Sequence, residues 1–201
     1  PECGHALIAE NTQAAKKLRK DSVIPRGLAA LGYTLNTPEE NKFLMQKHEL
    51  LAEVDVLLGG RAAEEIFIKE ISTGASNDLE RATDIIKAMI SMYGMSDIAG
   101  LMVLEKQRNT FLSGGQTIKD YSDKMAQDLD EYVKKTLDER YAGVKEILKT
   151  YSGAIETMVK ALYEEETIDG AKVREIIKNY EEENNLPTRL EEKEQEVTKD
   201  N

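Results

Sequence analysis

Apolar residues recur with the period of an α-helix along most of this sequence, and this pattern constrains the fold more than any other feature. Helices are expected at residues 2–15, 46–68, 76–94 and 119–150, then through Ile155 to Leu162, and finally after Asp169, which would cap the last one. Because the apolar residues of each helix fall on one face, the helices can pack around a shared core. The sequence therefore predicts a mainly α protein.

Gly59 and Gly60 stand in the middle of the expected helix at residues 46–68. Each glycine in a helix interior costs about 1 kcal/mol relative to alanine. Such a cost suggests that another backbone approaches the helix closely at this point. The helix at residues 2–15 is the natural candidate.

A small β-sheet is expected near the N-terminus, after a basic turn at residues 16–21. Val23–Ile24 and Leu31–Thr34 have strand composition and flank a Pro-Arg-Gly turn, whose Pro25 makes the first strand an edge or terminal strand. Two further local features are a capping box at Thr37-Pro38-Glu39-Glu40 and a glycine-containing connection at residues 98–117, which could include a strand at Leu101–Leu104.

The composition excludes several classes of function. The net charge of −11 disfavours nonspecific binding to nucleic acids or anionic membranes. Cys3 is the single cysteine, so an internal disulfide is excluded and a reducing compartment is indicated. The sequence contains neither an apolar run of membrane-spanning length nor a phosphate-binding G-x-x-x-x-G-K-[ST] loop.

Glu2 and His5 are three residues apart and share one face of the first expected helix. This spacing is the second half of H-E-x-x-H, in which two histidines hold zinc and the glutamate is a general base. Pro1 occupies the position of the first histidine. Alone, the pair is more typical of an ordinary helix start than of a metal site. Asp78 in a first helical turn would likewise stabilise the helix through its dipole by about 0.3–1 kcal/mol without a metal.

Four short motifs follow one another along the first part of the chain. They are Glu2-Cys3-Gly4-His5-Ala6, Ile24-Pro25-Arg26-Gly27, Leu58-Gly59-Gly60-Arg61-Ala62-Ala63-Glu64-Glu65 and Thr73-Gly74-Ala75-Ser76-Asn77-Asp78. In this order and at these separations they resemble the peptidase domain of the FtsH family, the membrane-anchored AAA+ zinc proteases. The resemblance implies a helical zinc-peptidase core at residues 1–117 and a C-terminal helical subdomain at 118–181. Residues 182–201 are rich in Glu and nearly free of apolar residues, which predicts an acidic, disordered tail.

The resemblance also implies roles for individual residues. His5 and Asp78 would be zinc ligands and Glu2 the general base, with Ser76 or Asn77 capping the helix that carries Asp78. Zinc in such a site acidifies the attacking water and polarises the scissile carbonyl. Arg61 and Glu65 could form an exposed ion pair or support the site. Cys3 faces away from Glu2 and His5 and is expected in the core.

Pro1 is a departure from the family pattern, because its side chain has no lone pair for a metal. If proline is truly the residue at this position, His5 and Asp78 leave a two-ligand site that would bind zinc weakly, and activity would be impaired. The chain would then be a catalytically inactive scaffold of the same family. His48 is expected to be a surface or cap residue. A coordinating N-terminal amine at Pro1 is a minor alternative.

The family resemblance further implies substrates and partners. We expect unfolded or membrane proteins to bind as an extended strand along Val23, Ile24, Leu31, Gly32, Tyr33 and Thr34. A homo-hexamer at the cytoplasmic side of the bacterial inner membrane is expected. ATP would act only in an AAA+ module that precedes residue 1 together with the membrane anchor, so these residues alone should show no ATPase activity and no direct membrane contact.

Overall fold

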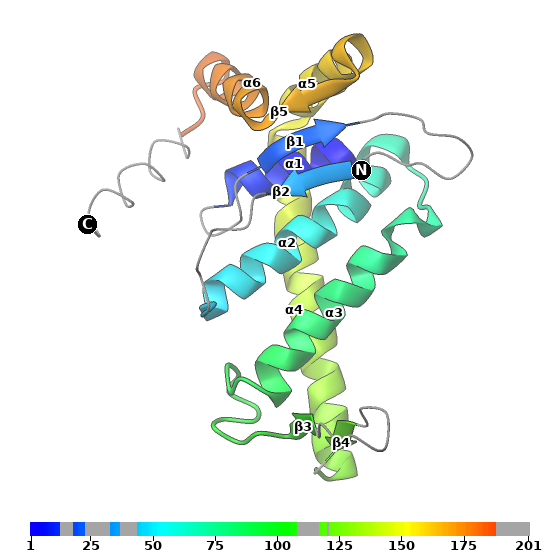
Figure 1. The fold of residues 1–201 in the computed structure, drawn as a ribbon, viewed down its shortest axis with the longest axis vertical. Coiled ribbons are helices and arrows are strands. Elements are labelled where there is room, and N and C mark those ends of the chain that lie inside the picture. The colour runs from blue at the N-terminus through cyan, green and yellow to red at the C-terminus, as the bar shows by residue number, and fades with distance from the viewer. Residues whose placement is uncertain (13–17, 23–32, 37–43, 108–116, 120, 188–201) are drawn as a thin grey trace.

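The computed structural model describes residues 1–12, 18–22, 33–36, 44–107, 117–119 and 121–187. Helices make up most of this part of the chain, so the prediction of a mainly α protein is confirmed. They are α1 (Glu2–Asn11), α2 (Lys47–Ala63), α3 (Ser76–Ser91), α4 (Asp123–Thr150), α5 (Ser152–Glu165) and α6 (Gly170–Glu183). Figure 1 shows α2 and α3 alongside the long α4, with α5 and α6 at one end of it. No helix of the described residues is long and apolar enough to cross a lipid bilayer.

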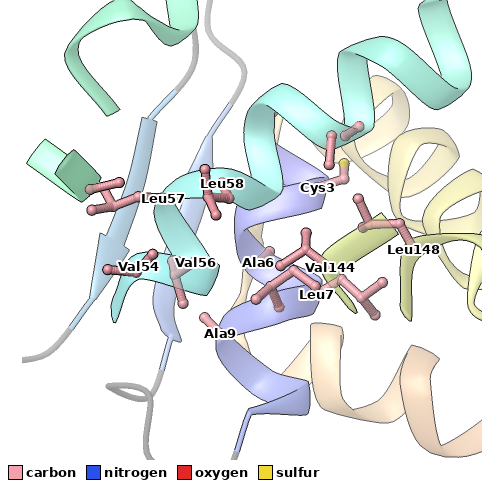
Figure 2. Close-up of a cluster of buried hydrophobic side chains, with 14 of the residues drawn as sticks. Cys3, Ala6, Leu7, Ala9, Val54, Val56, Leu57, Leu58, Val144 and Leu148 are labelled. Carbon is pink, nitrogen blue, oxygen red and sulfur yellow. The ribbon is translucent and has the colours of Figure 1, made fainter. Parts of the chain in front are cut away.

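The short helix α1 lies at the centre of the packing. It contacts α2, α4, α5 and α6 as well as the neighbouring strand β1 (Leu18–Ser22). Every residue from Ala6 to Asn11 is therefore buried, whereas α2–α4 also present faces to solvent. Figure 2 shows the core around α1, with Cys3, Ala6 and Leu7 beside Val144 and Leu148 of α4. Cys3 is a buried core residue, as predicted.

Two buried carboxylates fix the first two helices to the C-terminal part of the chain. Asp55 of α2 accepts hydrogen bonds from Nε of Arg140 in α4, at 2.7 Å, and from a terminal nitrogen of the same guanidinium. Glu10 of α1 accepts from Arg174 of α6 at 3.0 Å. A buried carboxylate needs such a partner, because removing it leaves an uncompensated charge. The pairs therefore specify how α1 and α2 sit against α4 and α6.

The sheet near the N-terminus has three described strands in the order β2–β1–β5, all antiparallel. The outer strands are β2 (Tyr33–Asn36) and β5 (Thr167–Asp169), which immediately precedes α6. The predicted basic turn at residues 16–21 is wrong, because Leu18–Asp21 belong to the central strand. Tyr33 and Thr34 form a strand as predicted, whereas Val23, Ile24, Leu31 and Gly32 lie outside the described residues.

A second pair of strands, β3 (Glu105–Gln107) and β4 (Thr117–Lys119), lies at the far end of α4 (Figure 1). The strand suggested at Leu101–Leu104 is therefore wrong, and the strand begins one residue later, at Glu105. Pairing with β4 decides this position, since β3 itself is polar. The Thr37–Glu40 capping box lies outside the described residues.

Several helix ends differ from the prediction. Helix α1 ends at Asn11 rather than at residue 15, and α4 begins at Asp123, where Ser122 accepts a hydrogen bond from the Met125 amide. After Ala63 the chain continues as a π-helix, Glu64–Ile68. Asp169 caps α6 as predicted, but α6 runs through Glu183, so the predicted disordered tail begins too early.

Candidate active site

His5 of α1 and Asp78 of α3 meet across the helix packing. His5 Nε2 lies 3.3 Å from Asp78 Oδ2, and the two side chains are 14% and 23% exposed. Asp78 lies in the first turn of α3, where the positive end of the helix dipole favours a carboxylate. The structure thus brings together the two residues that the family resemblance singles out as ligands.

Helix α1 crosses α2 at a very short distance, and this close crossing determines how near His5 lies to α2. A Cβ atom on Gly4 would lie 2.5 Å from the carbonyl oxygen of Gly59, and one on Gly59 would lie 2.9 Å from the carbonyl oxygen of Gly4. Such distances leave no room for a side chain on either residue. The predicted close approach at the glycine pair is confirmed, and the approaching element is α1.

The crossing lets the His5 ring reach the backbone of α2. Nδ1 of His5 lies 2.7 Å from the carbonyl oxygen of Val56. A carbonyl oxygen only accepts, so Nδ1 carries a proton and donates it. In the neutral ring the lone pair is then on Nε2, the nitrogen that faces Asp78. A histidine held through one nitrogen by a carbonyl and presenting the other is the usual arrangement of a metal-binding imidazole.

Opposing influences act on the pKa of His5. Burial, the largest, lowers it, but the hydrogen bonds with Asp78 and Val56 and the charges of Asp78 and Glu2 together raise it above its ordinary value of 6.5. A proton on His5 therefore stabilises its pairing with Asp78 when no metal is bound. A metal ion at Nε2 would have to displace that proton.

The segment that leads into α3 is tied to the end of α2. Ser72 Oγ donates to Glu64 Oε1 at 2.6 Å, and the Ser72 amide donates to Glu64 Oε2 at 3.3 Å. Arg61 donates to the Ser72 carbonyl oxygen at 3.0 Å and lies 3.6 Å from Glu64. Since Ser72 is six residues before Asp78, this network holds the start of α3 against α2.

The prediction that Ser76 or Asn77 caps α3 is wrong. The cap at this end is Ser72, whose Oγ accepts from the Gly74 amide and begins a short 3₁₀ helix at Thr73–Ala75. Neither Ser76 nor Asn77 caps α3, which starts at Ser76 as a continuation of that turn.

Arg61 forms its ion pair with Glu64 rather than with Glu65. Glu65 instead accepts from Tyr141 Oη at 2.6 Å and Lys145 Nζ at 3.2 Å, both in α4. These two hydrogen bonds hold the pKa of Glu65 below its ordinary value, and the one from Tyr141 has the larger effect. The pKa of Tyr141 is raised, mainly because the hydroxyl is partly buried and then because it donates this hydrogen bond to Glu65. Glu65 therefore joins the end of α2 to α4.

The donor pair fits a zinc ion in its spacing. Two ligands about 2.0–2.1 Å from a tetrahedral zinc lie roughly 3.3 Å apart, and His5 Nε2 and Asp78 Oδ2 are 3.3 Å apart. The fit covers two donors. No group of three or more His, Cys, Asp or Glu side chains suited to a metal occurs among the described residues. Pro1 and His48 are exposed, and no contact places His48 at the pair.

Sequence reasoning missed the backbone acceptor at Val56 and the roles of Ser72, Glu64 and Tyr141. A carbonyl group leaves no trace in a side-chain pattern, so nothing could have indicated Val56. Ser72 is a residue type that caps helices, and Glu64 lies within the quoted glycine-rich motif. Their pairing depends on how the loop folds back, which the spacing alone does not give.

The fold and the site define a class: a helical domain in which a histidine of one helix meets an aspartate of another, with a glutamate on the same helix face as the histidine. Comparison with known proteins gives the family. The sequence profile of Peptidase family M41 matches residues 1–176, and the chain belongs to that family.

Relatives from several bacteria carry the name ATP-dependent zinc metalloprotease FtsH. The protein of Helicobacter felis is 64% identical over 190 residues, which cover 94% of this chain and 30% of that protein. The protein of Sulfurovum sp. is 58% identical over 94% of this chain and 28% of its own length. That of Thermotoga maritima is 39% identical over 88% of this chain and 29% of its own length. The chain spans less than a third of these relatives.

Proposed function

We propose that this chain is the peptidase module of an ATP-dependent zinc metalloendopeptidase that hydrolyses peptide bonds of unfolded and membrane proteins. The observation that carries the proposal is the 3.3 Å approach of His5 Nε2 to Asp78 Oδ2, made by residues of two different helices. Membership of Peptidase family M41 supports it.

His5 and Asp78 would hold the zinc ion, which when bound supplies polarisation of the scissile carbonyl and an acidified water. The remaining chemistry belongs to Glu2, one turn before His5 on the same face of α1. Its charge already acts on the His5 imidazole, so its carboxylate lies within electrostatic reach of the site. As general base, Glu2 would take the proton of the attacking water and pass it to the leaving amine.

The substrate would bind as an added strand beside β2. Among the described strands, β2 pairs with β1 on one side only and so forms an edge of the sheet. An extended peptide can hydrogen-bond to such an edge through its backbone, with little selection for side chains. Tyr33 and Thr34 belong to this edge, and Val23, Ile24, Leu31 and Gly32 complete the proposed binding segment. This mode suits unfolded chains of varied sequence.

The proposals on assembly and location concern a protein as long as the matched relatives, of which this chain would be one domain. A homo-hexamer at the cytoplasmic side of the bacterial inner membrane would deliver unfolded chains to this domain, using ATP in an AAA+ module. Nucleic acid is not an expected partner, since the net charge is −11.

Pro1 favours a second candidate, a catalytically inactive scaffold of the same family. Proline offers no side-chain donor, and the described residues contain no third ligand beside His5 and Asp78. With two ligands zinc would bind weakly, and the domain would keep its fold and its contacts with other subunits while losing activity.

Restoring histidine at position 1 tests both candidates. We expect Pro1→His to bind about one zinc per chain tightly, as three protein ligands do in catalytic sites, and to hydrolyse casein. Zinc content by atomic absorption and casein cleavage are compared with the unchanged chain. If the chain is a peptidase module, Pro1→His should give it tight zinc binding and casein cleavage, or the unchanged chain should already show these two properties. A variant that binds zinc yet never cleaves casein would favour the scaffold, and one that binds no zinc would contradict both the ligand set and the peptidase.

A further inference from the structure

Gly59 and Gly60 are adjacent in α2, yet they face different neighbours across the crossing with α1. A Cβ atom on Gly59 would approach the carbonyl oxygen of Gly4 to 2.9 Å and Cγ1 of Ile8 to 3.1 Å. For a Cβ atom on Gly60, the three nearest atoms would all belong to the imidazole ring of His5: Nε2 is the nearest, followed by Cε1 at 2.6 Å and Cδ2 at 3.1 Å. The first glycine thus makes room for a backbone, and the second for a side chain.

The ring that occupies this space is held at both nitrogens. His5 Nδ1 is 2.7 Å from the Val56 carbonyl oxygen, and Nε2 is 3.3 Å from Asp78 Oδ2. Val56 lies one helical turn before Gly60 on the same face of α2. The imidazole therefore lies along α2, from the Val56 carbonyl to the bare backbone of Gly60.

We propose that Gly60 is a positioning residue for His5. Its missing side chain admits the imidazole onto α2 in the orientation that donates Nδ1–H to Val56 and presents Nε2 toward Asp78. The consequence for metal binding rests on the proposed role of His5 as a ligand. The position of the ring itself does not, since the ring is held by Val56 and Asp78 without a metal.

The two glycines should respond in opposite ways to alanine. Alanine favours a helix interior more than glycine does, so Gly60→Ala strengthens α2 itself. The clashing atoms at Gly60 are the end of a side chain, which can swing aside at the cost of its two contacts. At Gly59 the closest atom is the Gly4 carbonyl oxygen, which belongs to the backbone of α1 and cannot move without separating the helices. Gly60→Ala should therefore disturb the site and spare the fold, and Gly59→Ala should disturb the fold.

The experiment compares Gly60→Ala with Gly59→Ala and with Gly143→Ala, a control in α4 where a Cβ atom would meet nothing within 4 Å. In the zinc-free chain, at a pH above the pKa of His5, ¹⁵N chemical shifts of the neutral His5 ring report whether its proton is still localised on Nδ1. We expect Gly60→Ala to lose this signature while its Tm stays equal to or above that of the unchanged chain. Gly59→Ala should lower Tm, and Gly143→Ala should leave the ring shifts unchanged.

Removing the ring provides a second, independent readout. In a His5→Ala background the space above Gly60 is vacant, so Gly60→Ala should raise Tm there as Gly143→Ala does. In a Pro1→His background, Gly60→Ala should weaken zinc binding by about 10–100-fold, the usual effect of losing a residue that orients a ligand.

Unchanged ring shifts in Gly60→Ala would overturn the proposal. The proposal would also be overturned if Gly60→Ala lowered Tm as much as Gly59→Ala does, both in the unchanged chain and in the His5→Ala background. The space at Gly60 would then be needed by the backbone rather than by the ring. If the ring shifts change as expected but no Pro1→His protein binds zinc, the positioning of His5 by Gly60 is supported and the ligand role in the proposed function is refuted.

Discussion

The α1–α2 crossing and the packing of α6 against the junction of α4 and α5 are both buried, but different contacts hold them. At the crossing, backbone meets backbone at Gly4 and Gly59. At the C-terminal end, side chains mediate the packing: Tyr151 Oη donates to Glu181 Oε1 at 2.7 Å, and the rings of Tyr151 and Tyr180 lie 6.0 Å apart.

This difference separates positioning from stability. Backbone contact fixes two helices more closely than flexible side chains can, and the candidate site lies beside the region held in that way. The C-terminal helices contribute buried area and specific pairs but no donor to the site. Substitutions of side chains beside the crossing should therefore change the chemistry of the site. Substitutions between α4, α5 and α6 should change the free energy of unfolding alone.

The largest expected effect is on the rate of hydrolysis. In a Pro1→His background, Glu2→Gln should lower casein cleavage by about 10²–10⁴-fold, the usual contribution of a general base. Zinc content and Tm should not change, because glutamine keeps the size of the side chain. Equal rates with and without the substitution would show that Glu2 is not the base.

A core residue of the C-terminal part should show the opposite pattern. Ile177 is fully buried in α6, and Ile177→Ala should lower the free energy of unfolding by about 2–5 kcal/mol through lost contacts and a cavity. Urea denaturation measures this loss. The zinc affinity of the folded Pro1→His protein should not change, and a parallel loss of affinity would mean that the two regions are coupled.

The polar contact between the C-terminal helices should matter less. Glu181 is fully buried, and its Oε2 has no hydrogen-bond partner among the described residues. Tyr151→Phe removes the hydroxyl donor to the other oxygen and should cost about 1–3 kcal/mol of stability. Tyr163→Phe is the matched control, since Tyr163 is 86% exposed. Equal effects of the two substitutions would refute a special role for the buried contact.

The smallest expected effect concerns the network at the start of α3. Burial raises the pKa of Glu64, but the Ser72 hydroxyl and amide and the charge of Arg61 hold it below its ordinary value of 4.5. The unfolded chain therefore takes up the proton first, and this stabilisation is lost as pH falls below about 4.5. Glu64→Gln should flatten the decline of stability with pH in acid unfolding experiments, whereas the exposed Glu164→Gln should not. Identical profiles for the two variants would contradict the network.

The helices could be predicted from the sequence because their signal is local. The apolar stripe of α2, including Val54, Leu58 and Ala62, is buried as its spacing predicts. The close crossing followed from the cost of two glycines inside a helix. Helix ends were less predictable, since they depend on caps such as Ser122 and on the π-helix after Ala63.

The central strand could not be predicted in the same way. The segment Leu18–Ser22 is polar and lacks the alternation of a half-buried strand. It forms a strand because it pairs with β2 on one side and with β5, from the far end of the chain, on the other. Such pairing depends on the packed fold and has no local signature.

The candidate site was predictable where side-chain motifs carried it. His5, Asp78 and Glu2 came from the family resemblance, and the structure brings His5 and Asp78 together. The pairing of Arg61 with Glu64 rather than Glu65 depends on the ties of Glu65 to α4, which spacing along one helix cannot reveal.

Zinc affinity tests the central claim, that His5 and Asp78 together hold one metal ion. The chain with Pro1→His is titrated with zinc beside the same chain carrying Asp78→Asn or His5→Ala. We expect each substitution to weaken binding by more than about 100-fold, beyond what the loss of a merely orienting residue costs. An unchanged affinity in either variant would contradict the account.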